Sequence, residues 1–86
     1  MPAMPRPAFE RIAKALADSQ RCSILERIAS TKELCCSDIV DQCAVSQATI
    51  SHHLKELVTA DLVERRKDGQ FAYFRFRSEV MAAYLV

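Results

Sequence analysis

The sequence predicts an α+β domain, mainly α, in which a β-hairpin lies between amphipathic helices. Apolar residues recur at the helical period of 3.6 residues along most of the chain. From Leu62 onward the pattern changes to β-branched and aromatic residues. The dipeptide Asp68-Gly69, which holds the only glycine, lies in this second region and is typical of a two-residue hairpin turn.

Two helices are expected at the N-terminal end. Residues 1–7 contain three prolines and are predicted to be a loose leader of a single domain that spans 1–86. Apolar residues spaced i, i+3, i+4 and i+7 predict a first helix over Ala8–Ala17. Asp18 and Ser19 are the candidate N-caps of a second helix.

Two further helices are expected in the middle of the chain. A polar break and a short extended segment, Glu33–Cys35, separate the second helix from the third. Ser37 is expected to cap the third helix, which continues through Cys43. After a short turn, Ser46 is expected to cap the fourth helix, Gln47–Thr59.

A hairpin and a last helix complete the chain. Strands are predicted at Leu62–Lys67 and Gln70–Arg77, joined at Asp68 and Gly69 by a type I′ turn with positive φ at both residues. Ser78 is expected to cap a last helix that reaches the C-terminus. Two helices joined by a tight turn, the second followed by a hairpin, make a winged helix-turn-helix.

Charge gives only weak support for a nucleic-acid partner. The formal net charge is +1. Six basic and six acidic residues lie in 1–45, whereas six basic and four acidic residues lie in 46–77 together with both histidines. The small excess therefore falls on the fourth helix and the hairpin, where a DNA surface is needed.

The outer face of the fourth helix carries short polar side chains and a cation, which suit a recognition helix in the major groove. Gln47 can bond adenine, His52 can donate to guanine, and Ser46 and Thr49 suit phosphates near the helix N-terminus. The alternatives are a solvated helix face, an ordinary charged strand and, for His53, a core-edge residue bonded to backbone. The predicted DNA-binding residues are Ser46, Gln47, Ala48, Thr49, Ser51, His52, Lys55, Arg65, Arg66, Lys67 and Gln70.

The stretch Ala15–Phe76, roughly three quarters of the chain, resembles the ArsR/SmtB family of bacterial metal-responsive repressors. The segments that carry the resemblance are ALADSQRCSIL, ELCCSDIV, VSQATISHHLKELVTADLV and RKDGQFAYFRF. It implies a homodimer built through the first and last helices that represses transcription at double-stranded operator DNA until an inducer binds. Family members commonly run further, so the last helix, which ends at Val86, is expected to be short or truncated.

The four cysteines are expected to be reduced in the cytoplasm, because no secretory signal precedes them. Arsenic- and cadmium-type family members carry a segment similar to ELCVCDL. Here Cys35 matches its first cysteine, Ser37 stands in place of its second, and Cys36 lies between them. The resemblance thus implies a metal site at Cys35 and Cys36 for the soft ions As(III), Sb(III) or Cd(II). For this pair, a plain structural role is as open as a role as ligand or redox switch.

The other cysteines and the last helix are less informative. Cys22 and Cys43 stand where relatives have leucine, so core thiols are expected, although either could complete a soft-ion site within one chain or across the dimer. Zinc-type family members use Asp, His and Glu ligands on the last helix. Between Arg75 and Val86 only Glu79 is of these types, so that zinc site is not expected.

Three functions remain open at this point. The first is a repressor induced by arsenite or another soft ion, and the second is a repressor with a thiol redox switch or no inducer site. The third is a winged-helix module that binds proteins and not DNA. An enzyme, a required cofactor and a membrane segment are not expected, since the sequence has no glycine-rich phosphate loop, nucleophile motif, paired acids or long apolar run.

Overall fold

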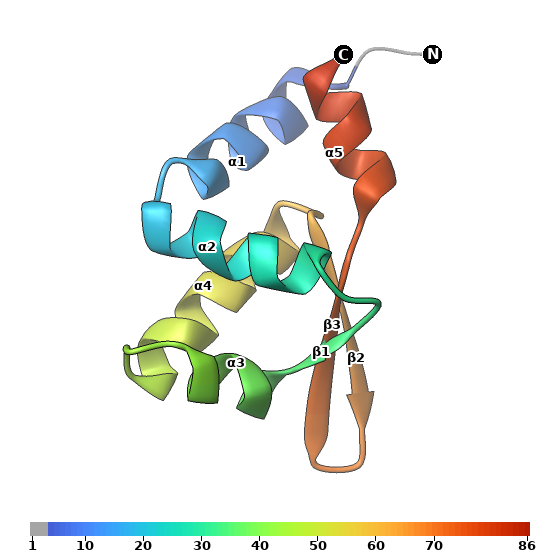
Figure 1. Cartoon of the computed structure of the whole chain (residues 1–86). Coiled ribbons are helices and arrows are strands. Elements are labelled where there is room, and N and C mark those ends of the chain that lie inside the picture. The colour runs from blue at the N-terminus through green and yellow to red at the C-terminus, as the bar shows by residue number, and fades with distance from the viewer. Residues whose placement is uncertain (1–3) are drawn as a thin grey trace.

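A computed structural model of the chain describes residues 4–86 (Figure 1). The order of its elements confirms the order predicted from the sequence. The elements are α1 (Arg6–Leu16), α2 (Ser19–Ala29), β1 (Leu34–Cys35), α3 (Cys36–Gln42), α4 (Gln47–Thr59), β2 (Val63–Asp68), β3 (Phe71–Phe76) and α5 (Ser78–Leu85).

The first helix begins earlier than the proline content suggests. Pro5 is the N-cap of α1, and Arg6 and Pro7 already lie in the helix. Proline is compatible with the first helical turn, where no intrahelical bond from its nitrogen is needed. The predicted leader is therefore wrong for Arg6 and Pro7, and its residues 1–3 lie outside the described part of the chain.

Two serines predicted as helix caps lie inside their helices. Helix α3 begins at Cys36 with Cys35 as its N-cap, and α5 begins at Ser78 with Arg77 as its N-cap. In both places a β-strand leads almost directly into the helix, so the strand's end fixes the helix start. The hydroxyl of Ser37 instead lies 3.3 Å from the Cys35 sulfur.

The hairpin turn differs from the predicted one. Asp68 pairs with Phe71 in the β2–β3 ladder, so the two loop residues are Gly69 and Gln70. Among the turn residues only Gly69 has positive φ, +62°. Positive φ at the first loop residue alone is the pattern of a type II′ turn, so the type I′ prediction is wrong. Because the turn lies one residue later than predicted, β2 extends to Asp68 and β3 begins at Phe71.

The three strands form one antiparallel sheet in the order β1-β3-β2. The chain enters β2 through a left-handed cap at the end of α4. Asp61 has φ +61°, its N–H donates to Val58 O at 3.0 Å, and the Leu62 N–H donates to Leu57 O at 3.1 Å. These bonds satisfy the last carbonyls of α4 and turn the chain toward the hairpin.

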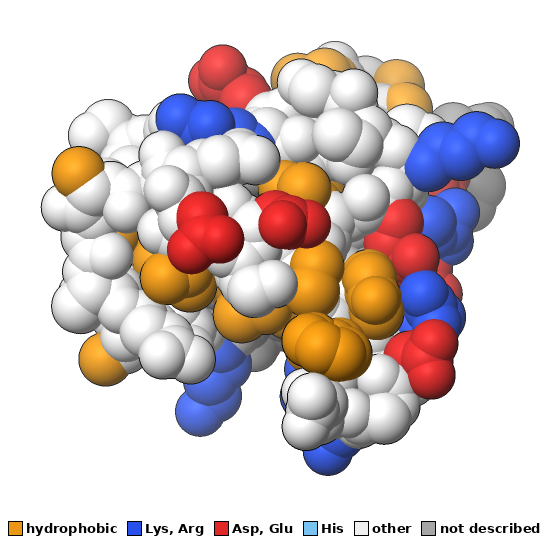
Figure 2. Space-filling view, turned by 60° about the horizontal axis from the view of Figure 1, so that its bottom comes forward, with side chains coloured by type: hydrophobic (Ala, Val, Ile, Leu, Met, Phe, Trp, Pro, Cys, Tyr) orange, Lys and Arg blue, Asp and Glu red, His pale blue; other side chains and the backbone are white. Residues whose placement is uncertain are grey.

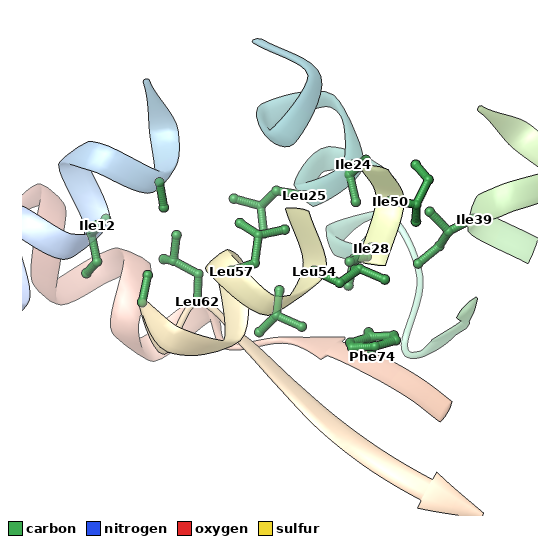
Figure 3. Close-up of a cluster of buried hydrophobic side chains, with 13 residues drawn as sticks. Ile12, Ile24, Leu25, Ile28, Ile39, Ile50, Leu54, Leu57, Leu62 and Phe74 are labelled. Atoms are coloured by element: carbon green, nitrogen blue, oxygen red, sulfur yellow. The ribbon is translucent and has the colours of Figure 1, made fainter. Parts of the chain in front are cut away.

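The hydrophobic core joins all the helices up to α4 to the sheet. Ile24 of α2, Ile39 of α3 and Ile50 of α4 lie close together at one side of the core (Figure 3). Phe74, 4% exposed, closes the core from β3. The buried hydrophobic residues are Ile12, Ala15, Ile24, Leu25, Ile28, Ile39, Ile50, Leu54, Leu57, Ala60, Leu62, Val63 and Phe74.

Two groups of elements lie at opposite ends of the molecule. Helices α1 and α5 lie together at the upper end of Figure 1, where the Phe9 and Tyr84 ring centroids are 4.8 Å apart. Helix α3, the start of α4 and the hairpin tip lie toward the opposite end (Figure 1). Within residues 4–86, none of the helices has the length and apolarity needed to cross a bilayer.

Candidate nucleic-acid interface

Helix α4 presents one polar face because its apolar residues anchor the other. Ile50, Leu54 and Leu57 are buried, as their spacing on the helical wheel predicts. The side chain of Ser46 caps the helix by accepting from the Thr49 N–H at 3.2 Å, which confirms the predicted N-cap. The side-chain hydroxyls of Ser46 and Thr49 also bond each other at 2.9 Å.

A buried polar network fixes α4 against α2. His53 and Arg21 expose only 5% and 8% of their surfaces. Arg21 Nε donates to His53 Nδ1 at 3.3 Å, and His53 Nε2 lies 3.1 Å from Gln20 Oε1. Because a guanidinium only donates, Nδ1 must be the acceptor, and Nε2 then carries the hydrogen donated to Gln20. His53 is thus a core-edge residue, bonded to side chains and not to backbone.

Arg21 is itself held by the end of α1 and the start of α2. Its Nη1 donates to the carbonyls of Lys14 and Ala15 at 3.4 and 3.3 Å. Its backbone N–H donates to Asp18 Oδ1 at 3.0 Å, which confirms Asp18 as the N-cap of α2. This backbone hydrogen bond is the main cause of a lowered pKa of the Asp18 carboxyl. One arginine therefore ties three helices together behind the exposed face of α4.

The hairpin turns one of its faces toward α4. Arg65 pairs with Phe74, and Lys67 pairs with Ala72. Since side chains alternate along a strand, Arg65 and Lys67 lie on one face and Arg66 on the other. Arg65 and Lys55 line a hollow of about 380 Å³ between α4 and the sheet, with an apolar floor that includes Phe74. Within residues 4–86 neither cation has a carboxylate partner.

Arg66 is occupied on the opposite face of the hairpin. Its Nε and Nη2 donate to the two carboxylate oxygens of Glu33 at 3.0 and 2.8 Å. Its guanidinium carbon lies 4.7 Å from the centroid of the Tyr73 ring. The hydrogen bonds from Arg66 hold the pKa of Glu33 below its ordinary value. Arg66 thus fastens the hairpin to the loop before β1 and does not join the surface shared by Arg65 and Lys55.

The remaining predicted DNA-binding side chains are accessible. All of them are exposed except Thr49, which is half-buried beside Ser46. Figure 2 views the molecule with the lower end of Figure 1 brought forward, and it shows hydrophobic side chains gathered near the middle with Lys and Arg side chains toward the margins. The fold brings the predicted residues of α4 and of the hairpin to this end of the molecule (Figure 1).

A second hollow joins the cysteine pair to the same surface. Cys35 and Cys36 line a hollow of about 300 Å³ together with Gln47 of α4 and Gln70 of the hairpin turn. Burial, followed by the charge of Cys35, raises the pKa of the Cys36 thiol, so Cys36 is protonated at neutral pH. The two thiols and two of the predicted DNA-binding side chains therefore share one cavity.

The other two cysteines lie apart from this hollow. Cys22 is half-buried, and its thiol lies 3.0 Å from the carbonyl of Leu16, a bond that links α2 to α1. Cys43 is half-buried and packs against the core at the end of α3. These surroundings fit the predicted core thiols. In the part of the chain that the structure describes, no cluster of three or more His, Cys, Asp or Glu residues is placed to hold a metal ion.

Sequence reasoning missed two features of this end of the molecule. The buried Arg21 was not anticipated, because a lone arginine in an amphipathic helix is usually exposed. The proximity of Cys35 and Cys36 to the β2–β3 hairpin, which forms the wing, was also missed. It depends on the pairing of Cys35 with Tyr73, by which β1 joins the hairpin as a third strand, and no local pattern in either segment predicts that pairing.

Comparisons with known proteins agree with this architecture. A family model described as a helix-turn-helix domain matches residues 16–66. The chain is 40% identical over 70 residues to the arsenical resistance operon repressor of Staphylococcus aureus, and the match covers 81% of this chain and 66% of that protein. It is 36% identical over 76 residues to the HTH-type transcriptional regulator YceK of Bacillus subtilis, with 87% and 76% of the two chains covered.

Solved structures give the same result. A homodimeric winged helix-turn-helix DNA-binding domain from Mycobacterium bovis superposes with a TM-score of 0.80 at 26% identity, covering 99% of this chain and 84% of that one. An ArsR-like regulator from Rhodococcus has a TM-score of 0.84 at 24% identity, covering 92% and 74%, and so supports the fold alone. The recognition helix, the hairpin wing and these relatives together show that this chain belongs to the ArsR family of winged helix-turn-helix transcriptional regulators.

Proposed function

We propose that the chain is a sequence-specific transcriptional repressor that binds operator DNA as a homodimer and releases it when arsenite or another soft thiophilic ion binds Cys35 and Cys36. The observation that carries this proposal is the hollow that both thiols share with Gln47 and Gln70. An ion bound there lies against side chains from both DNA-reading elements, so the ion and the DNA compete for the same groups.

The exposed face of α4 supports base reading in the major groove. Gln47 and His52 are exposed near the start of the helix, where recognition helices approach base edges. Ala48 and Ser51 are small and allow close approach. Lys55 and Arg65 supply positive charge between the helix and the wing, where it suits phosphates. Arg66 has the weakest support as a DNA contact, because Glu33 already neutralises it.

A homodimer is supported by the opposite end of the molecule. Phe9 and Leu85 expose 41% and 73% of their surfaces beside the α1–α5 contact. Exposed apolar groups of this kind mark an interface, and a chain of 86 residues gains stability from association. Pairing through α1 and α5 leaves the lower end of Figure 1 free for DNA. Two-fold symmetry then presents two α4 helices to two half-sites.

The relatives support an inducer of the soft-ion class. The chain matches 66% of the Staphylococcus aureus arsenical resistance repressor and 57% of the cadmium resistance regulator CadC of Listeria innocua. The sulfurs of Cys35 and Cys36, which lose their protons when an ion binds, favour such soft ions over hard cations. We further propose that residues 1–86 are a single non-catalytic domain that acts in the cytoplasm, because regulation through operator DNA requires neither catalysis nor a membrane.

The test is binding to duplex DNA from upstream of the coding sequence, measured by gel shift with arsenite, cadmium, zinc and peroxide as separate additions. We expect salt-dependent binding that arsenite abolishes and that persists in arsenite when both cysteines are replaced (Cys35→Ala with Cys36→Ala). Cys22→Ser is the matched control and should release DNA as the wild type does. Arsenite release that survives the double replacement contradicts the cysteine site, and absence of salt-dependent binding contradicts the repressor.

A further inference from the structure

The hollow at the cysteine pair has an apolar wall that a bare metal ion does not need. Val40, Phe71 and Ala72 line it beside the two thiols. Phe71 exposes 46% of its surface, although it is large and apolar. It directly follows the hairpin turn and pairs with Asp68, so the β2–β3 ladder fixes its backbone at the edge of the hollow. An exposed aromatic ring at the edge of a hollow offers a stacking surface to a ligand.

The two thiols satisfy only part of the valence of arsenic. Arsenic(III) forms three bonds, and its soft character favours sulfur in each of them. Cys35 and Cys36 supply two thiols in the hollow, while the Cys22 thiol is directed to the Leu16 carbonyl on another side of the molecule. Arsenite bound to this pair keeps a hydroxyl as its third substituent. An organic arsenical brings a carbon substituent instead, and a carbon substituent suits an apolar wall.

We propose that the hollow selects a trivalent arsenical that carries one aryl group, with arsenic bonded to the sulfurs of Cys35 and Cys36 and the aryl ring against Phe71 and Val40. This inference rests on the proposed function, because it names the ligand class of the same site. Ring stacking on Phe71 adds to the two arsenic–sulfur bonds, so the aryl compound binds more tightly than arsenite does.

The binding step is a ligand exchange without redox change. In the aryl arsenous acid, arsenic carries the aryl carbon and two hydroxyl groups. Two arsenic–oxygen bonds break and two arsenic–sulfur bonds form, while each thiol proton leaves with a hydroxyl group as water. Arsenic stays in the +3 state.

The direct test compares phenylarsine oxide with arsenite by isothermal titration calorimetry on the reduced full chain. We expect Phe71→Ala to weaken phenylarsine oxide binding roughly tenfold, the loss of one aromatic contact, and to change arsenite binding less than about twofold. Lys14→Ala, at an exposed residue of α1 that does not line the hollow, is the control and should change neither. Phe71→Tyr keeps the ring and should retain the preference. Equal changes for both arsenicals, or no change for either, overturn the proposal.

Cysteine variants and a DNA-release assay provide the remaining tests. Cys36→Ser should abolish binding of both arsenicals, and Cys22→Ser should abolish neither; retained phenylarsine oxide binding in Cys36→Ser overturns the site. If arsenite releases DNA but phenylarsine oxide binding does not depend on Phe71, the aryl selectivity alone fails. If the Phe71 effect is found but neither arsenical releases DNA, the selectivity stands and the proposed regulation fails.

Discussion

The first prediction concerns the buried Arg21 behind helix α4 and the free energy of unfolding that its hydrogen bonds contribute. Replacing Arg21 with methionine keeps an unbranched side chain of similar helix propensity but removes the donors to His53 Nδ1 and to the carbonyls of Lys14 and Ala15. Hydrogen bonds from a charged group contribute about 1.5–3 kcal/mol each, but these three are long, at 3.3–3.4 Å. Removing the buried charge also recovers part of its desolvation cost.

The net effect is therefore a loss of about 2 kcal/mol in the free energy of unfolding. That corresponds to a lowering of Tm by about 10 °C in a domain of this size. Urea denaturation followed by circular dichroism measures the loss at equilibrium. The control is Arg27→Met in the same helix, where an exposed guanidinium bonds only Gln42 at 3.0 Å, and it should cost at most about 0.5 kcal/mol. If Arg21→Met is as stable as Arg27→Met, the network does not hold α4 and the reasoning is refuted.

Three further predictions concern helix ends, the hairpin turn and acid. Ser46→Ala removes the side-chain acceptor of the Thr49 N–H and should cost about 1 kcal/mol in urea denaturation, whereas Ser46→Asp should be neutral. Gly69→Ala meets no atom within 4 Å but forces φ +62° on an alanine, so it should cost about 1 kcal/mol, and Asp61→Gly should gain a similar amount by relieving φ +61°. An unchanged midpoint in either variant contradicts the turn geometry. Because Arg66 lowers the pKa of Glu33, that pair stabilises the fold above the ordinary value of 4.5 and loses its effect as pH falls through the lower folded value. Glu33→Gln should therefore flatten the acid limb of a plot of stability against pH, and an identical limb in both proteins would show that the pair contributes nothing.

The order of the elements was predictable because each has a local cause. The spacing of Ile50, Leu54 and Leu57 defines the inner side of α4, and Ser46 caps it as expected. The face that the sequence assigned to DNA is the exposed one in the structure, with Thr49 half-buried at its edge. Local pattern and tertiary packing agree here, as they do wherever an amphipathic helix covers a core.

The errors arise where a distant contact decides the local structure. The start of α3 depends on β1 pairing with β3, which places Cys35 in the sheet and leaves Ser37 inside the helix. The hairpin turn depends on the Asp68–Phe71 pair, which moves the loop to Gly69 and Gln70. Neither pairing has a signal in its own segment. For the same reason the shared hollow of the cysteines, the wing and α4 appears only once the chain is folded.

The central claim is that the exposed face of α4 and the adjoining face of the wing bind duplex DNA. The most direct measurement is the affinity for upstream duplex DNA by fluorescence anisotropy, comparing the wild type with Lys55→Glu and with Lys14→Glu, an exposed lysine on α1. A phosphate contact at Lys55 predicts that Lys55→Glu weakens binding at least about tenfold and lowers the salt slope, while Lys14→Glu changes it less than about twofold. Equal losses in the two variants, or none in Lys55→Glu, would contradict the claim.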